Sequence, residues 1–230
     1  MSPLSKVLLF IAAVLITVDC RATISSEDIL EAMMKLEEVT DASIERNLNR
    51  LMESRKEYDV VMGGNLRNAL KKMRENVRNS IDRLENLESE AGVDVKECTE
   101  DVGKTISRIP IIPTKDMFLC MNAEEKNVNQ VTKKSQESVK DVERIVDELE
   151  TKATNCGDEQ CLQDVLVEIL ETIESLPTIV NVKGNAGVRA IENVQSSMIE
   201  CTSKTINLVE VKIWAVEYHA TKCIEEKSNK

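Results

Sequence analysis

Residues 66–87 read LRNALKKMRENVRNSIDRLENL. Apolar residues recur there every three or four positions, at Leu66, Leu70, Met73, Val77, Ile81, Leu84 and Leu87. This spacing places them on one side of an α-helix, because residues three and four apart share a helix face. An upstream stripe runs through Ile44, Leu48, Leu51, Tyr58 and Met62. The two stripes predict two amphipathic helices, and Gly63-Gly64 between them predicts a helical hairpin over residues 23–92.

Further apolar stripes follow downstream and are separated by helix-breaking residues. The stripes lie within residues 121–149, 162–176 and 191–224, and the breaks are at 110–113, 155–157, 177 and 184–187. Proline removes a backbone donor and glycine ends helices, so each break is expected to separate two elements. Ser25-Ser26-Glu27-Asp28, with a capping hydroxyl and early carboxylates, is expected to start one helix, and Asp158 is expected to cap another. We therefore expect an all-α fold, an elongated antiparallel helical bundle of about four to six amphipathic helices.

The composition supports this fold class and excludes others. The chain has 230 residues, of which 42% are hydrophobic and only 2% aromatic, with seven Gly and four Pro. These are too few turn-forming residues for a β-sandwich or β-barrel with many strands. Lys and Arg number 30 against 41 Asp and Glu, a formal charge of −11. A net acidic chain argues against a nucleic-acid partner, because that binding depends on neutralising phosphates.

Residues 1–22 have the three parts of a secretory signal peptide. Lys6 supplies the positive charge, residues 7–18 form an apolar run, and Cys20-Arg21-Ala22 supplies the small residues of a cleavage site. A helix of this apolar length rises only ~18 Å, short of the ~30 Å hydrocarbon core of a membrane. We therefore expect a secreted, extracellular protein without stable membrane insertion.

Six cysteines follow this segment, and they are Cys98, Cys120, Cys156, Cys161, Cys201 and Cys223. An even number in an exported chain predicts disulfides, whereas zinc is disfavoured because no Cys-x2-Cys pair exists and His219 is the only histidine. Pairing from the outside inward gives residue numbers that add to 321, 321 and 317. A nearly constant sum is what two antiparallel arms require. It predicts Cys98–Cys223, Cys120–Cys201 and Cys156–Cys161, with a Cys98–Cys120 bridge as the alternative if 110–113 fold the chain back.

Catalytic chemistry has little support in the sequence. His219 is the only imidazole, and no Gly-x-Ser-x-Gly nucleophile elbow accompanies it. We expect no enzymatic activity, no cofactor and no metal. Trp214 and Tyr218 lie in the most apolar and aromatic part of the chain after residue 22. A cleft around them is the first candidate for a small hydrophobic ligand.

The secretory start, the helices poor in aromatic residues and the six cysteines with a central Cys-x4-Cys resemble the TsetseEP-domain family of secreted insect proteins. The resemblance covers about residues 93–228. That domain has no assigned function, so the resemblance implies secretion and an insect source but supplies no catalytic residues.

The sequence thus predicts a signal peptide at 1–22, a helical hairpin at 23–92 and a disulfide-bonded helical domain at 93–230. The expected function is that of a secreted, non-enzymatic helical protein acting by interaction in an extracellular fluid. Its expected partner is an extracellular protein or a second copy of itself. The alternative is a carrier that holds lipid or a small hydrophobic ligand between its helices.

Overall fold

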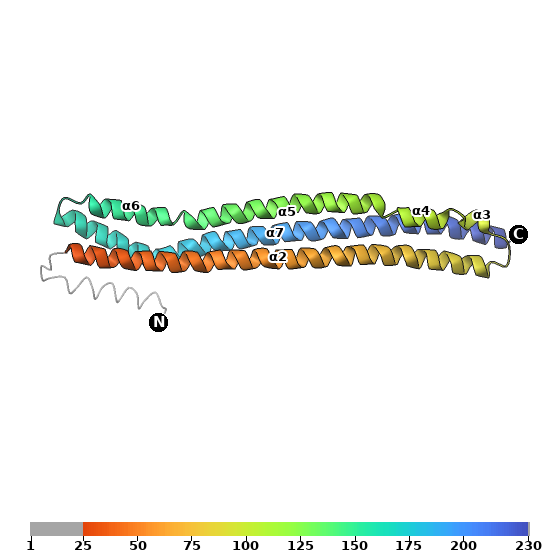
Figure 1. The fold of residues 1–230 in the computed structure, drawn as a ribbon, viewed down its shortest axis with the longest axis horizontal. Helices are drawn as coiled ribbons and strands as arrows, with labels where there is room; N and C mark the ends of the chain where they lie inside the picture. Colours follow the sequence, from red (N-terminus) through yellow and green to blue (C-terminus); the bar gives the residue numbers. More distant parts are fainter. Residues whose placement is uncertain (1–24, 230) are drawn as a thin grey trace. The chain divides into compact units, whose positions relative to one another are not determined.

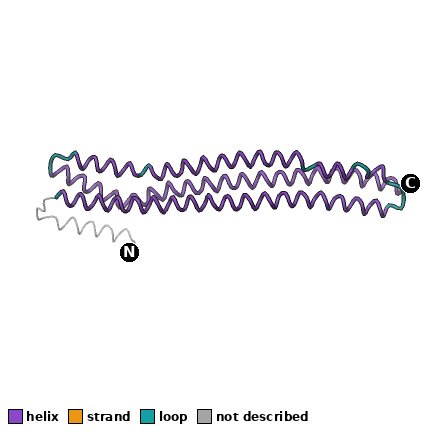
Figure 2. The backbone as a smooth tube through the Cα atoms, in the orientation of Figure 1, coloured by secondary structure: helices purple, strands orange, loops and turns teal. Residues whose placement is uncertain are grey.

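The structure is a computed structural model that describes residues 25–229, so the expected signal peptide lies outside the described residues. The described residues form helices joined by short turns, and they contain no strand. The helices, drawn in Figures 1 and 2, are α2 (Ser26–Glu90), α3 (Lys96–Thr99), α4 (Val102–Arg108), α5 (Ile111–Lys140), α6 (Glu143–Thr154) and α7 (Glu159–Ser228). The all-α prediction is confirmed. No helix in this part of the chain has the length and apolar character needed to cross a membrane.

The predicted number of helices is wrong, because only α2, α5 and α7 are long, with 65, 30 and 70 residues. α2 runs through Gly63-Gly64 without a break, so residues 23–92 do not form a hairpin. α7 likewise continues through Pro177 and past Gly187. In each case buried apolar residues lie on both sides of the expected break, and their packing outweighs the local cost of Gly or Pro.

Other expected boundaries coincide with helix ends. α4 ends at Arg108 and α5 begins at Ile111, so Pro113 stands in the first turn of α5, where its missing N–H costs little. A break that was not expected separates α5 from α6 at residues 141–142. The two predicted helix starts are capped as expected. Asp28 N–H donates to Ser25 Oγ at 3.2 Å, and Cys161 N–H donates to Asp158 Oδ1 at 2.8 Å.

The chain forms two compact units that differ from the domains expected at 23–92 and 93–230. Unit 1 contains the chain up to Asn47 together with Ser138–Val182, and unit 2 contains Leu48–Glu137 and Lys183–Lys230. α2 and α7 each contribute residues to both units. Each unit therefore combines two segments of the chain that are far apart in sequence.

Unit 1 buries an aliphatic core. Leu36, Ile169, Leu176 and Val180 are fully buried, and Leu149 is 2% exposed. Asn47 Nδ2 donates to Asn181 Oδ1 at 3.2 Å, which joins α2 to α7. Lys152 Nζ donates to Glu168 Oε1 at 2.5 Å, which joins α6 to α7.

Unit 2 is a three-helix arrangement whose core is rich in methionine. Its main cluster is Ala69, Met73, Leu84, Ile106, Met117, Met121, Met198, Cys201, Val209, Ile213 and Ala220. Pairs between α2 and α7 keep a constant difference in residue number, as in Asn76–Glu210 and Arg83–Glu217, so these two helices run parallel. α5 runs antiparallel to both. The predicted antiparallel arrangement therefore holds for α2 with α5 and for α5 with α7, but not for α2 with α7.

Candidate functional site

Three disulfides connect the arms, and they are the pairs that the cysteine spacing predicts. Cys98 is bonded to Cys223, Cys120 to Cys201, and Cys156 to Cys161, with Cα–Cα distances of 5.7, 6.1 and 5.4 Å. The first two lie in unit 2, where they join α3 and α5 to α7. The third closes the turn between α6 and α7 in unit 1. All six cysteines of the described residues are therefore committed to bridges.

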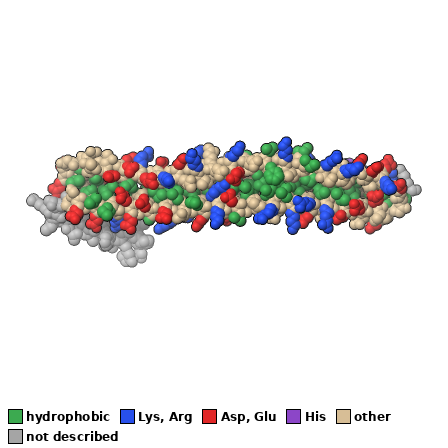
Figure 3. Space-filling model, in the orientation of Figure 1, with side chains coloured by type: hydrophobic (Ala, Val, Ile, Leu, Met, Phe, Trp, Pro, Cys, Tyr) green, Lys and Arg blue, Asp and Glu red, His purple; other side chains and the backbone are tan. Residues whose placement is uncertain are grey.

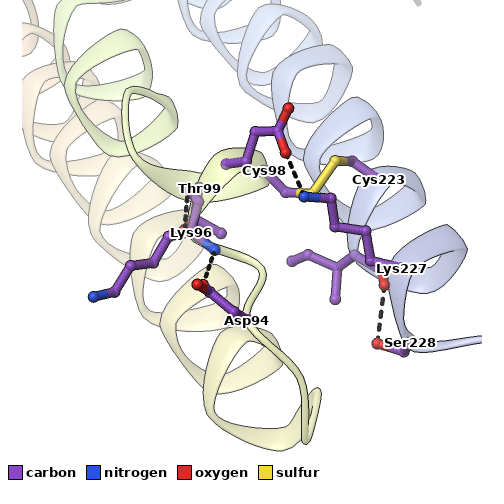
Figure 4. Close-up of a disulfide and its surroundings, with 9 residues drawn as sticks. Asp94, Lys96, Cys98, Thr99, Cys223, Lys227 and Ser228 are labelled. Atoms are coloured by element: carbon purple, nitrogen blue, oxygen red, sulfur yellow. Dashed lines mark hydrogen bonds and ion pairs between the residues drawn. A yellow bond between two sulfur atoms is a disulfide. The ribbon is translucent and has the colours of Figure 1, made fainter. Parts of the chain in front are cut away.

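The Cys98–Cys223 bridge is reinforced by its surroundings, which Figure 4 shows. Cys98 is 5% exposed and packs with Val95 and Ile224. Lys227 Nζ donates to Glu97 Oε2 at 2.5 Å, which joins the end of α7 to α3 beside the disulfide. This ion pair lowers the pKa of Glu97. The end of α7 is thus held to α3 by a covalent bond, an apolar contact and an ion pair.

The predicted ligand candidates Trp214 and Tyr218 lie on the surface of unit 2. Their rings are stacked with centroids 5.5 Å apart, and 64% of Trp214 and 50% of Tyr218 is exposed. Trp214 lines a groove of about 190 Å³ together with polar side chains, among them Asn76, Asn79 and Arg83. Ligand pockets usually enclose ~300–1,000 Å³ behind mainly apolar walls. The aromatic pair therefore lies at the surface beside a small groove with polar lining, and its role as a ligand site stays a prediction.

The polar side of this groove is a hydrogen-bonded ion pair between α2 and α7. Arg83 donates to both carboxylate oxygens of Glu217, from Nε at 2.5 Å and from Nη2 at 2.7 Å. Ser80 Oγ donates to the same carboxylate at 2.8 Å. The hydrogen bonds from Arg83, and secondarily that from Ser80, lower the pKa of Glu217 against the opposing effect of burial. This two-point contact fixes the register of the two helices.

A buried polar cluster in unit 2 was not predicted as a site. Tyr58 is fully buried, its hydroxyl has no hydrogen-bond partner, and the Arg55 guanidinium lies 5.0 Å from its ring centroid. Arg55 Nη2 donates to Glu125 Oε1 at 2.6 Å. Burial, followed by the charge of Glu125, raises the pKa of Tyr58 to about 12. The available sequence signal was a single tyrosine within an otherwise aliphatic stripe.

His219 is exposed and contacts the Tyr218 ring edge-on, with centroids 5.8 Å apart. Within residues 25–229 no group of three or more His, Cys, Asp or Glu side chains is arranged to hold a metal ion.

Charge is divided unevenly between the two units. The described part of unit 1 has 18 Asp and Glu against 5 Lys and Arg, a net charge of −13. The described part of unit 2 has 22 of each and is neutral. The acidic character of the chain therefore belongs to unit 1, and basic surface is concentrated in unit 2.

Comparison with known proteins finds no matching family model, no similar curated protein and no similar solved structure. Membership of the TsetseEP-domain family stays a prediction.

Proposed function

We propose that this chain is a secreted, non-enzymatic protein that acts by presenting a disulfide-stabilised helical surface to a partner in an extracellular fluid. The observation that carries the proposal is the pairing of all six cysteines after residue 22 into three disulfides. Disulfides persist in oxidising compartments, and each contributes about 2–4 kcal/mol by restricting the unfolded chain. The most prominent aromatic side chains are exposed, which supports recognition at a surface.

Mass spectrometry of the protein purified from its secretion tests this proposal. The expected mass begins near residue 21 or 23, is six hydrogens below that of the reduced chain, and carries no adduct under non-denaturing conditions. Unreduced peptides should contain the three pairs. Free thiols, or a mass that retains residues 1–20, would refute the secreted interaction protein.

A groove in unit 1 favours a carrier as the second candidate. Ile29, Leu30, Met33 and Met34 of α2 line it with Leu162 of α7, and its volume is about 350 Å³. Leu30 and Met34 remain more than 60% exposed, so an apolar ligand would cover them. A stoichiometric lipid-sized adduct in the native mass spectrum would support the carrier. Met34→Glu should remove that adduct, while Met52→Glu, at an equally exposed methionine of unit 2, should retain it.

A further inference from the structure

A row of four basic side chains runs along the surface of α2 in unit 2. Arg67, Lys71, Arg74 and Arg78 are all exposed and follow one another at steps of four, three and four. At about 100° per residue, these steps keep the four within about 60° of one another around the helix. Met73 is 2% exposed and marks the core side of α2. The row lies roughly 100–160° from it, on the side that faces solvent and α5.

These cations are only weakly engaged by the protein itself. Lys71 Nζ lies 3.7 Å from Glu75 Oε1, and Arg78 Nε lies 3.6 Å from Asp82 Oδ2. All four of these side chains are more than half exposed. Arg67 donates to Gly63 O, one turn earlier in the same helix. Arg74 makes no hydrogen bond or ion pair with the described residues. Exposed pairs of this kind contribute ~0–1 kcal/mol, so the row can exchange them for an external anion.

The first two turns of α5 place exposed apolar side chains beside this row. Thr114 Oγ1 lies 3.9 Å from Met73 Sδ, which puts the start of α5 next to the residue that precedes Arg74. Ile111 and Phe118 lie roughly 60° and 40° around α5 from Thr114, on the outer side of this contact. Ile111 is 64% exposed and Phe118 is 40% exposed.

Figure 3 shows blue side chains over the part of α2 that belongs to unit 2, and green ones over the start of α5. We call this surface, made of the four cations with Ile111 and Phe118, the α2–α5 face.

The combination of charges and apolar groups distinguishes between partners. A dissolved polyanion, or the acidic unit 1 of a second copy, would use the four cations and leave Ile111 and Phe118 in water. The surface of an anionic bilayer uses both, because headgroups attract the cations while apolar side chains enter the region below them. We propose that the α2–α5 face docks this protein on the surface of an anionic phospholipid bilayer. This inference rests on the proposed function, of which it specifies the partner.

Co-sedimentation of the full secreted chain with vesicles tests the inference. The protein should bind vesicles of phosphatidylcholine mixed with phosphatidylserine, bind phosphatidylcholine alone much less, and release as salt is raised. Each cation near such a surface changes the partition coefficient about five-fold, so Arg67→Gln with Arg74→Gln should lower it about 25-fold. The control is Arg144→Gln with Lys204→Gln, which removes two exposed cations of α6 and α7, outside the face, and should bind as wild type.

A second variant tests the apolar part. Phe118→Ser should lower binding to the phosphatidylserine vesicles roughly five-fold, because the partly exposed ring no longer enters the bilayer. Absence of vesicle binding, or an equal loss in the control, would overturn the inference. So would tight heparin binding with no effect of Phe118→Ser on vesicle binding, or salt-sensitive self-association in place of vesicle binding. These last two results would overturn membrane docking but keep the proposed function, with a different partner. Free thiols, or a mass that retains residues 1–20, would instead refute the proposed function itself.

Discussion

Replacing Gly187 by Ala should destabilise the protein relative to the same replacement at Gly63. A Cβ atom at Gly187 would stand 2.6 Å from Leu51 Cδ2 and 2.7 Å from Ser135 Cβ, well inside van der Waals contact. Leu51 is fully buried, and Ser135 Cβ moves only with the backbone of α5. Gly187 is therefore the point at which three helices of unit 2 approach closely. At Gly63 a Cβ would meet nothing within 4 Å.

The magnitude follows from two opposing effects. Ala in a helix interior is more favourable than Gly by about 0.5–1 kcal/mol, and Gly63→Ala should gain that full amount. Gly187→Ala has the same gain, but overpacking of a close contact costs about 1–3 kcal/mol. Its free energy of unfolding should thus be about 1–3 kcal/mol below that of Gly63→Ala and at or below that of the wild type.

Urea denaturation followed by far-ultraviolet circular dichroism, with the disulfides intact, measures both variants. Adding Ser135→Gly to Gly187→Ala should recover part of the loss, because it removes one of the two contacting carbons. An equal gain in stability from Gly63→Ala and Gly187→Ala would refute the close approach of the helices at this point.

Three further predictions concern the disulfides and the titrating groups. Removing the Cys120–Cys201 bridge with two Ser substitutions should lower the free energy of unfolding by about 2–4 kcal/mol, and removing Cys156–Cys161 should lower it less because that loop is short; thermal unfolding compares them. The pKa of Glu217 is lowered by Arg83, so stability should fall as pH drops below the ordinary Glu value of 4.5, and Arg83→Gln should flatten this dependence in acid denaturation. The pKa of Tyr58 is raised to about 12, so stability should fall between pH 10 and 12; in Tyr58→Phe that part of the dependence should disappear from alkaline denaturation curves.

The sequence predicted those features that depend on local chemistry or on spacing. Steps of three and four placed Met73 and Leu84 in the core, and both are buried. Short capping motifs located the starts of α2 and α7 because a side chain three residues away satisfies an otherwise free N–H. The nearly constant sum of the cysteine positions indicated two antiparallel arms, since covalent pairs mark the register of helices directly.

The predicted helix breaks were wrong for a reason that a single stripe does not reveal. Proline in a helix interior costs ~3 kcal/mol, but Leu176 and Val180 on either side of Pro177 are fully buried. Burial of two such side chains contributes ~3–6 kcal/mol, which offsets the cost as long as the helix continues along its neighbours. The balance depends on those neighbours being present, and residues far away in sequence provide them.

The parallel contact between α2 and α7 shows why the candidate site could not be located from the sequence. No cysteine joins these helices; their register is carried by polar pairs such as Asn76–Glu210 and Arg83–Glu217, which look like ordinary surface residues in the sequence. The small polar residue Ser135, which interrupts the apolar stripe of α5, has the same origin. A small side chain is needed there because Gly187 of α7 comes within contact distance. An interruption in an apolar stripe can therefore mark the place where two helices approach most closely. In the same way, the basic row on α2 forms a mixed charged and apolar face only because α5 lies beside it.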